Sequence, residues 1–203
     1  MAYSARYRQL ASRIEGLRKL FLPVRFSNTG TYNADQLDKA RAFRILTHAE
    51  LEHYFEERVL EIAALSFNLW KTRLKPCASL ACLLANVSGD RTSLPKKIGT
   101  NTTAITIAGK ALAQFNHTVI NNNGIRIANL LELLLPIGID ESTIDPVWLS
   151  VVDGFGAKRG LAAHTAAVTY QIDPKDELQT VKQIMSGVQD IDLALNAIKK
   201  NIR

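Results

Sequence analysis

The longest stretch without a helix-breaking residue limits the fold of this chain more than any other feature. From Gln36 to Leu74 the sequence contains neither glycine nor proline, and Pro76 follows two residues later. Acidic and basic side chains alternate through the middle of this stretch, as they do on a solvent-facing helix surface. We therefore expect one helix of about 40 residues with Asp35 as its N-cap, a length at which bends are common.

Shorter helical patterns flank the long helix on both sides. Apolar residues recur at helical spacing within residues 3–21, and a single apolar stripe runs from Leu178 to Ile198. Residues 102–120 begin with β-branched side chains, which are compatible with a strand, but the alanines that follow favour a helix. We therefore expect an all-α fold, a bundle of long antiparallel helices with additional short helices.

Two Asp-Pro pairs mark the starts of helices in the C-terminal half. Asp145 precedes Pro146, and Asp173 precedes Pro174. Aspartate is a favoured N-cap residue, and proline fits the first helical position because its missing N–H would have no partner there. The sequence "NNNG" at residues 121–124 predicts a turn, since asparagine and glycine tolerate left-handed backbone conformations.

The chain is expected to consist of a basic N-terminal helix and loop in residues 1–35 and one compact helical domain in residues 36–203. The best candidate for a linker is the stretch 88–101, which contains glycine, proline, aspartate and serine. Helical patterning resumes directly after it, so this stretch predicts a loop and not a domain boundary.

The charge of the chain favours a polyanionic partner. The net charge is +6, and residues 1–25 hold six basic residues against the single acid Glu15. Such a segment suits RNA; it also resembles an Arg-rich organellar presequence, and a solvated amphipathic helix explains it without any partner. No apolar run approaches the ~20 residues of a membrane span, so we expect no membrane association and a cytoplasmic location.

Residues that bind metals or act as nucleophiles are few and dispersed. Cys77 and Cys82 lie five apart, which matches neither a disulfide framework nor the closer pairs of a zinc site, and we expect two buried, small apolar side chains. The four histidines form no HExxH motif and no Asp/His cluster, and no phosphate-binding glycine loop or nucleophile elbow is present. The sequence therefore predicts neither a metal nor a cofactor.

The stretch "FGAKRGLAAH", residues 155–164, places Arg159 and His164 among small side chains. On an ideal helix, residues five apart diverge by roughly 140° and lie ~7.5 Å apart along the axis. The two side chains can meet at one phosphate if a helix starts or breaks between them, as Gly160 permits, or if a two-fold dimer supplies a second copy of the pair. A surface arginine with a capping or core histidine is the alternative.

The motif "RGLAAH" resembles the Arg–His motif of the HEPN (higher eukaryotes and prokaryotes nucleotide-binding) superfamily, in which an arginine is followed by four to six residues and a histidine. Two further stretches, "LTHAELEHYFEE" (residues 46–57) and "NNNGIRIANLLELLLPIGID" (residues 121–140), resemble one bacterial branch of the family, the RiboL-PSP-HEPN type. The resemblance covers roughly residues 36–200 and leaves out the basic N-terminal helix.

The resemblance implies a metal-independent endoribonuclease that works as a homodimer and serves as a toxin or phage-defence effector, with an antitoxin or another regulatory protein as partner. His164 would be the general acid/base, taking the 2′-OH proton or protonating the leaving 5′-oxygen, and Arg159 would stabilise the charge on the phosphoryl oxygens. The product would be a cyclic phosphate, and the need for a 2′-OH implies RNA as the substrate. A non-catalytic HEPN-like module that binds a nucleotide, RNA or a protein is the alternative, and a dimeric structural bundle is a third.

Four further residues are candidates for auxiliary roles at this site. Active relatives often carry a polar residue directly after the arginine, where this chain has Gly160, and Lys158 and Asp153 are the nearby polar groups that can compensate. His48 and Glu52, four residues apart on the long helix, can pair on one face of it. For this pair we favour a structural hydrogen bond that braces the bundle.

Overall fold

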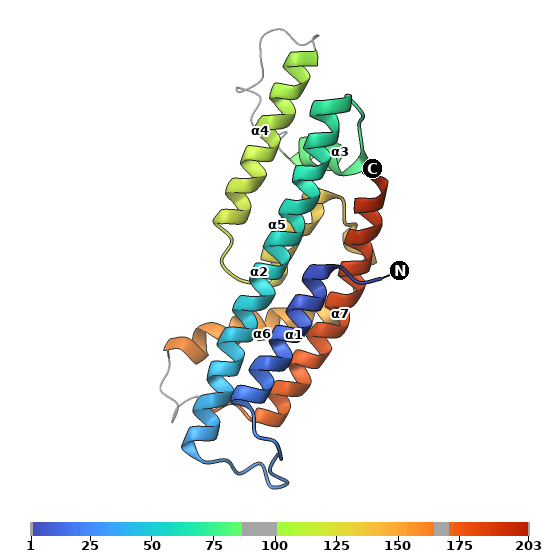
Figure 1. The fold of residues 1–203 in the computed structure, drawn as a ribbon. Coiled ribbons are helices and arrows are strands. Elements are labelled where there is room, and N and C mark those ends of the chain that lie inside the picture. Colours follow the sequence, from blue (N-terminus) through green and yellow to red (C-terminus); the bar gives the residue numbers. More distant parts are fainter. Residues whose placement is uncertain (1, 87–100, 165–170, 203) are drawn as a thin grey trace.

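The computed structural model describes residues 2–86, 101–164 and 171–202, except for the side chains of residues 101, 102, 161, 163 and 164. Within these ranges the chain forms α-helices and short 3₁₀ helices and no β-strand (Figure 1). The elements are α1 (Ala5–Phe21), α2 (Ala34–Arg73), α3 (Ala78–Asn86), α4 (Asn101–Ile120), α5 (Ile127–Leu134), η2 (Leu135–Ile137), η3 (Glu141–Thr143), α6 (Pro146–His164) and α7 (Pro174–Asn201). The expected all-α fold is confirmed.

The long helix α2 begins at a cap that differs from the expected one. The N-cap is Asn33, whose side chain accepts a hydrogen bond from the backbone N–H of Gln36 (2.9 Å), while the Gln36 side chain accepts one from the backbone N–H of Asn33 (3.1 Å). This reciprocal capping box satisfies two backbone donors that the helix cannot pair internally. The prediction of Asp35 as N-cap is therefore wrong. Asp35 lies in the first turn instead, where its charge is favourable at the positive end of the helix.

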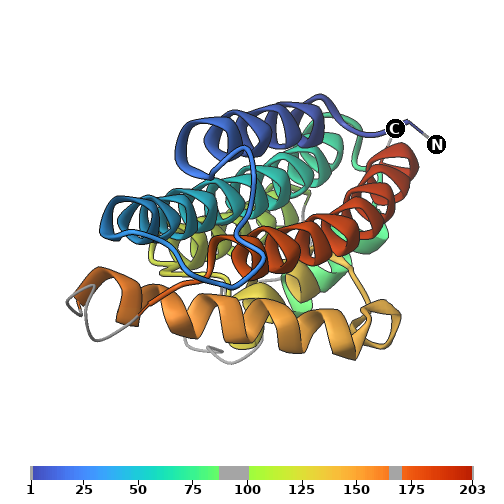
Figure 2. The ribbon, with the colours of Figure 1, turned by 90° about the horizontal axis from the view of Figure 1, so that it is seen from below.

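The long helices stack in three layers. Helices α1 and α6 lie on opposite sides of the layer that α2 and α7 form (Figure 2), while α3 and α4 pack together at one end of α2. Both apolar stripes expected from the sequence face the core, because their spacing keeps them on one side of a helix. The buried stripe residues are Tyr7, Leu10, Ile14 and Leu17 on α1 and Val181, Ile184, Val188, Ile191 and Leu195 on α7.

A buried polar cluster fastens α1 to both central helices. The Asp192 carboxylate on α7 accepts hydrogen bonds from the backbone N–H of Ser4 (2.7 Å), the Ser4 hydroxyl (2.6 Å) and the Tyr54 hydroxyl (2.8 Å). Arg58 Nε lies 3.3 Å from the same carboxylate and balances its charge. Since a buried carboxylate without partners is costly, this cluster holds α1 in one place against the bundle.

Trp148 fixes α6 against α7. Its indole is buried, and Nε1 donates a hydrogen bond to the backbone carbonyl of Ile184 (2.9 Å). The ring fills the space over Gly187, where an added Cβ would lie 2.3 Å from Trp148 Cδ1. The missing side chain at position 187 therefore allows the close approach of the two helices that places the rest of α6.

The two cysteines differ from their expected environment. Cys77 and Cys82 are free thiols and only half-buried. The expectation that both side chains would be fully buried is therefore wrong. The buried positions of α3 belong to Ser79, Leu80 and Leu83, which leaves Cys82 at the edge of its packed face. None of the described helices combines the length and the apolar character needed to cross a membrane.

Candidate functional site

Helix α6 continues without interruption from Pro146 to His164, through Gly160. No helix start or break therefore separates Arg159 from His164, and that route to bringing the two side chains together within one chain is absent. An unbroken helix directs them roughly 140° apart. The backbone of His164 ends α6, and its side chain lies outside the described residues.

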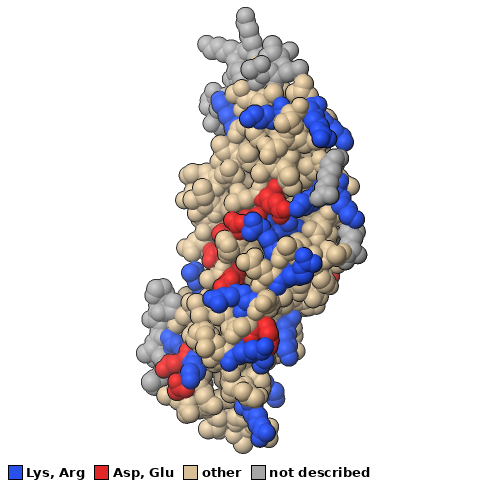
Figure 3. All heavy atoms as spheres, in the orientation of Figure 1, with Lys and Arg blue, Asp and Glu red and all other residues tan. Residues whose placement is uncertain are grey.

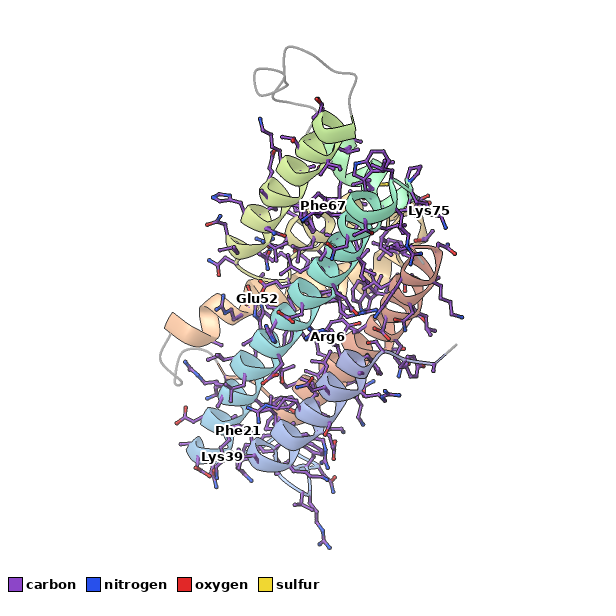
Figure 4. All side chains as sticks on the ribbon, turned by 45° about the horizontal axis from the view of Figure 1, so that its top comes forward. Arg6, Phe21, Lys39, Glu52, Phe67 and Lys75 are labelled. Atoms are coloured by element: carbon purple, nitrogen blue, oxygen red, sulfur yellow. The ribbon has the colours of Figure 1, made fainter. Side chains whose placement is uncertain are left out.

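The Arg159 side chain points to a place where three segments meet. Its Nη1 donates a hydrogen bond of 3.3 Å to Oδ1 of Asn123, in the loop between α4 and α5. Its positive charge also acts on two groups of α2. It adds to the lowering of the His48 pKa, and it partly opposes a rise in the Glu52 pKa that has other causes. Figure 4 labels Glu52 in the middle of α2, at the height where α6 passes the helix. The charge of the predicted phosphate-binding residue thus acts on both auxiliary candidates on α2.

The loop that carries Asn123 is held against α2 by a chain of hydrogen bonds. Gly124 adopts a φ of +128°, a region that side chains other than glycine rarely enter, and its backbone N–H donates to the Glu52 carboxylate. Asn122 Nδ2 donates to Glu56 Oε1 (2.9 Å) and to the Gly124 carbonyl (3.1 Å), and Asn129 Nδ2 donates to Asn122 Oδ1 (3.2 Å). The sequence "NNNG" therefore does more than turn the chain, since it fixes the position of the partner of Arg159.

His48 is buried behind this cluster. Its side chain is 1% exposed, and its ring stacks on Phe155 of α6 with the centroids 6.2 Å apart. Burial, followed by the charge of Arg159, lowers the pKa of His48 to about 4, so the imidazole is neutral at pH 7.

The hydrogen bond expected between His48 and Glu52 is not formed. His48 Nδ1 lies 3.7 Å from Glu52 Oε2, beyond hydrogen-bond distance, and has no other partner among the described residues. His48 supports the site from inside the core and does not reach solvent.

Glu52 lies at the boundary between core and solvent, with its side chain 16% exposed. Desolvation is the largest influence and raises the pKa of the Glu52 carboxyl above its usual range, and the nearby charge of Glu56 acts in the same direction. The hydrogen bond from Gly124 and the charge of Arg159 oppose the rise. Glu52 is therefore a carboxylate in contact with solvent whose affinity for a proton is higher than normal.

Asp153 and Lys158, the two auxiliary candidates on α6, are placed differently. The Asp153 carboxylate accepts hydrogen bonds from Nε and Nη2 of Arg126 (3.1 and 3.2 Å) and from the backbone N–H of Ile127 (3.2 Å). These bonds tie the start of α5 to α6 and occupy the carboxylate. Lys158 is exposed on the helix surface beside Arg159, where an ammonium group adds positive charge for a polyanion.

Two arginines of α2 that the sequence does not single out hold α6 in place. Arg41 Nη2 donates a 2.6 Å hydrogen bond to the carbonyl of Ala162 near the C-terminal end of α6, where a cation is favourable. The Arg44 guanidinium lies 5.6 Å from the ring centroid of Phe155 and forms a buried double hydrogen bond with Glu177 of α7. One face of α2 thus supports α6 along its C-terminal half.

The basic residues of α1 are partly neutralised. Arg6 pairs with Glu57 (2.6 Å) and Arg13 with Glu50 (2.8 Å), both across to α2. Figure 3 shows acidic side chains set among the basic ones on this face of the molecule. The basic excess of residues 1–25 therefore does not appear as one continuous positive surface.

The site combines a guanidinium, a neighbouring amide and a carboxylate with raised proton affinity. A guanidinium presents planar donors that match phosphate oxygens, and a carboxylate can accept a proton. No three His, Cys, Asp or Glu side chains are grouped as metal ligands in the part of the chain that the structure describes. Comparisons of the chain with protein-family models, with curated proteins and with solved structures found no match.

Proposed function

We propose that this protein is a metal-independent endoribonuclease of the HEPN type. The observation that supports the proposal best is the contact of Arg159 with Asn123, because the next residue of that loop, Gly124, donates to Glu52 and a guanidinium near a carboxylate suits phosphate binding and proton transfer. The resemblance of "RGLAAH" to the family motif adds His164 as the second reactive group. RNA is the proposed substrate, since only RNA carries the 2′-OH that can attack its own phosphodiester.

Arg159 has the electrostatic role in the proposed reaction. Negative charge develops on the phosphoryl oxygens as the 2′-oxygen attacks phosphorus, and a guanidinium held in advance by Asn123 stabilises that charge without having to reorganise. His164 exchanges a proton with the reacting oxygens, for which an unperturbed pKa of about 6.5 is well suited. The products are a 2′,3′-cyclic phosphate and a 5′-hydroxyl.

A second copy of the chain completes the proposed site. Because α6 is unbroken, Arg159 and His164 of one chain diverge and cannot easily act on one phosphate. A two-fold axis beside the end of α6 brings Arg159 of one copy to His164 of the other. The exposed Ala157 and Gly160 leave room for the approach of a second backbone.

The proposal is tested with purified protein, single-stranded RNA and excess EDTA. Cleavage that leaves cyclic-phosphate ends is expected, with Arg159→Ala and His164→Ala each slowing it about 100-fold or more. Arg8→Ala and His53→Ala are matched controls, because Arg8 is exposed on α1 and His53, although it follows Glu52 in the sequence, is exposed on the side of α2 that faces α1. Both variants should cleave like wild type. Full activity of Arg159→Ala would contradict the proposal.

The second candidate function is a non-catalytic module in which Arg159 only clamps a phosphate. Gly160 favours it, since this exposed position offers no side chain where ribonucleases of the HEPN superfamily often carry a polar group. This candidate predicts RNA binding that His164→Ala leaves unchanged and no cleavage over long incubation.

The proposed biological role is that of a toxin or defence effector acting on RNA in the cytoplasm, restrained by an antitoxin. It predicts that expression of the wild-type chain arrests bacterial growth and that expression of Arg159→Ala does not.

A further inference from the structure

Cleavage by the 2′-hydroxyl needs one group to remove the hydroxyl proton and another to protonate the leaving oxygen. The proposed function assigns His164 to proton transfer without deciding which of the two steps it serves. The structure offers a second proton-transfer group on α2, next to the loop that holds Arg159. The assignment of the two steps to these two groups rests on the proposed function.

Glu52 is positioned to act at the same phosphate as Arg159. Its carboxylate is oriented by the backbone N–H of Gly124, the residue directly after the Asn123 that holds Arg159. The charge of Arg159 acts on this carboxylate and favours its ionised form. With 16% of its side chain exposed, Glu52 keeps a path to a bound substrate.

The other titratable groups around Arg159 are unsuitable as proton acceptors for RNA. His48 is 1% exposed, so a substrate cannot reach its ring. Glu56 is engaged by Asn122 at 2.9 Å, and Asp153 is engaged by Arg126 and by the start of α5. Glu52 accepts one hydrogen bond, from the backbone N–H of Gly124, and the charge of Arg159 acts on it.

We infer that Glu52 is the general base of this site and that His164 is the general acid. The proton of the 2′-hydroxyl moves to a Glu52 carboxylate oxygen while the 2′-oxygen forms a bond to phosphorus. The bond from phosphorus to the 5′-oxygen breaks, and the proton of the His164 imidazolium moves to that oxygen. The chain ends with a protonated Glu52, a neutral His164, a 2′,3′-cyclic phosphate and a 5′-hydroxyl, so atoms and charges balance.

The environment of Glu52 fits this role. A carboxylate in water is a weak base at neutral pH, and partial desolvation together with Glu56 makes it stronger by raising its pKa. Arg159, Glu56 and His48 are the charged or titratable groups that face it from α6 and α2, and His48 is neutral at pH 7. The Nδ1 of buried His48 lies 3.7 Å from Glu52 Oε2 and has no hydrogen-bond partner among the described residues.

The first experiment compares Glu52→Gln with Glu57→Gln across a pH series. Both variants remove one negative charge from α2, but Glu57 pairs with Arg6 on the α1 side. Glu57→Gln should retain wild-type cleavage. Glu52→Gln should lower kcat/KM about 100-fold or more and should abolish the decline of the wild-type rate at acidic pH, since no carboxylate remains to be protonated. A uniform loss that keeps the acidic decline indicates a merely structural role and overturns the inference.

The second experiment separates the base from the acid with a substrate whose leaving group needs no proton, a uridine 3′-(4-nitrophenyl phosphate). On this substrate His164→Ala should regain most of its lost rate, and Glu52→Gln should stay as impaired as on RNA. Recovery of Glu52→Gln in place of His164→Ala overturns the assignment. Full RNA cleavage by Glu52→Gln, with Arg159→Ala inactive, overturns this inference alone, whereas equal activity of wild type and Arg159→Ala overturns the proposed function.

Discussion

Arg159 Nη1 and Asn123 Oδ1 lie 3.3 Å apart, which joins the C-terminal half of α6 to the loop between α4 and α5. This contact holds the guanidinium of a long, flexible side chain near one orientation. Because such side chains lose considerable conformational freedom when they bind a ligand, a preformed contact lowers that loss.

Removing the amide of Asn123 should weaken the stabilisation of the substrate phosphate by Arg159. We expect Asn123→Ala to lower kcat/KM for RNA cleavage about tenfold, the effect of losing one hydrogen bond to a charged group at a partly exposed position. Asn121→Ala is the matched control, because the Asn121 side chain bonds to His117 and not to Arg159. Equal activity of the two variants would show that the contact with Asn123 has no role in catalysis.

Gly124 is expected to be intolerant of any side chain. Its φ of +128° is strained for L-residues, so Gly124→Ala should lower the free energy of unfolding by about 1–3 kcal/mol. Gly16→Ala, in the exposed surface of α1 with nothing near its added Cβ, should instead raise it by about 0.5–1 kcal/mol. Urea denaturation measures both, and a neutral Gly124→Ala would mean that the loop adapts freely.

Among the glycines that the structure describes, Gly187 has the least room for a side chain, because Trp148 lies over it. Gly187→Ala places a Cβ 2.3 Å from the indole and should destabilise the protein by about 1–3 kcal/mol or more. Trp148→Phe provides space but loses the hydrogen bond to Ile184, so the double variant should be less destabilised than the sum of the single ones. Additive effects in this double-mutant cycle would contradict direct contact.

His48 should make the fold less stable in acid. Its pKa is lowered from 6.5 to about 4, so the unfolded chain binds a proton at this site between those pH values and the folded chain does not. Stability from neutral His48 is therefore lost as pH falls from about 6.5 to about 4, by about 3 kcal/mol for a depression of this size. The raised pKa of Glu52 acts in the opposite sense, because folding takes up a proton there.

The pH dependence of unfolding separates these contributions. His48→Asn should remove most of the loss of stability between pH 6.5 and pH 4, whatever its effect on stability at pH 7. An unchanged slope in His48→Asn would show that the imidazole is not kept neutral by the fold.

Sequence periodicity predicts the helices of this protein well and its site only in part. The extent of α2 and the buried stripes of α1 and α7 follow from local spacing, which the bundle preserves. The cap of α2 was harder to predict, because Asn33 and Asp35 are both good N-cap residues and only the reciprocal bond with Gln36 distinguishes them.

The proximity of Glu52 and Asn123 to Arg159 depends on tertiary packing and not on spacing. The three residues belong to segments far apart in the chain, and Trp148 over Gly187 helps to set how α6 lies against its neighbours. The run of three asparagines before Gly124 was the available signal, since a simple turn does not require so many amides.

The composite nature of the site is tested most directly by mixing two inactive variants. Arg159→Ala and His164→Ala are each purified, combined, and allowed to exchange subunits before RNA cleavage is measured in EDTA. A mixed dimer carries one intact Arg159–His164 pair across its axis, so cleavage should return to about one quarter of the wild-type rate. A mixture no more active than either variant alone would contradict a site shared between two copies of the chain.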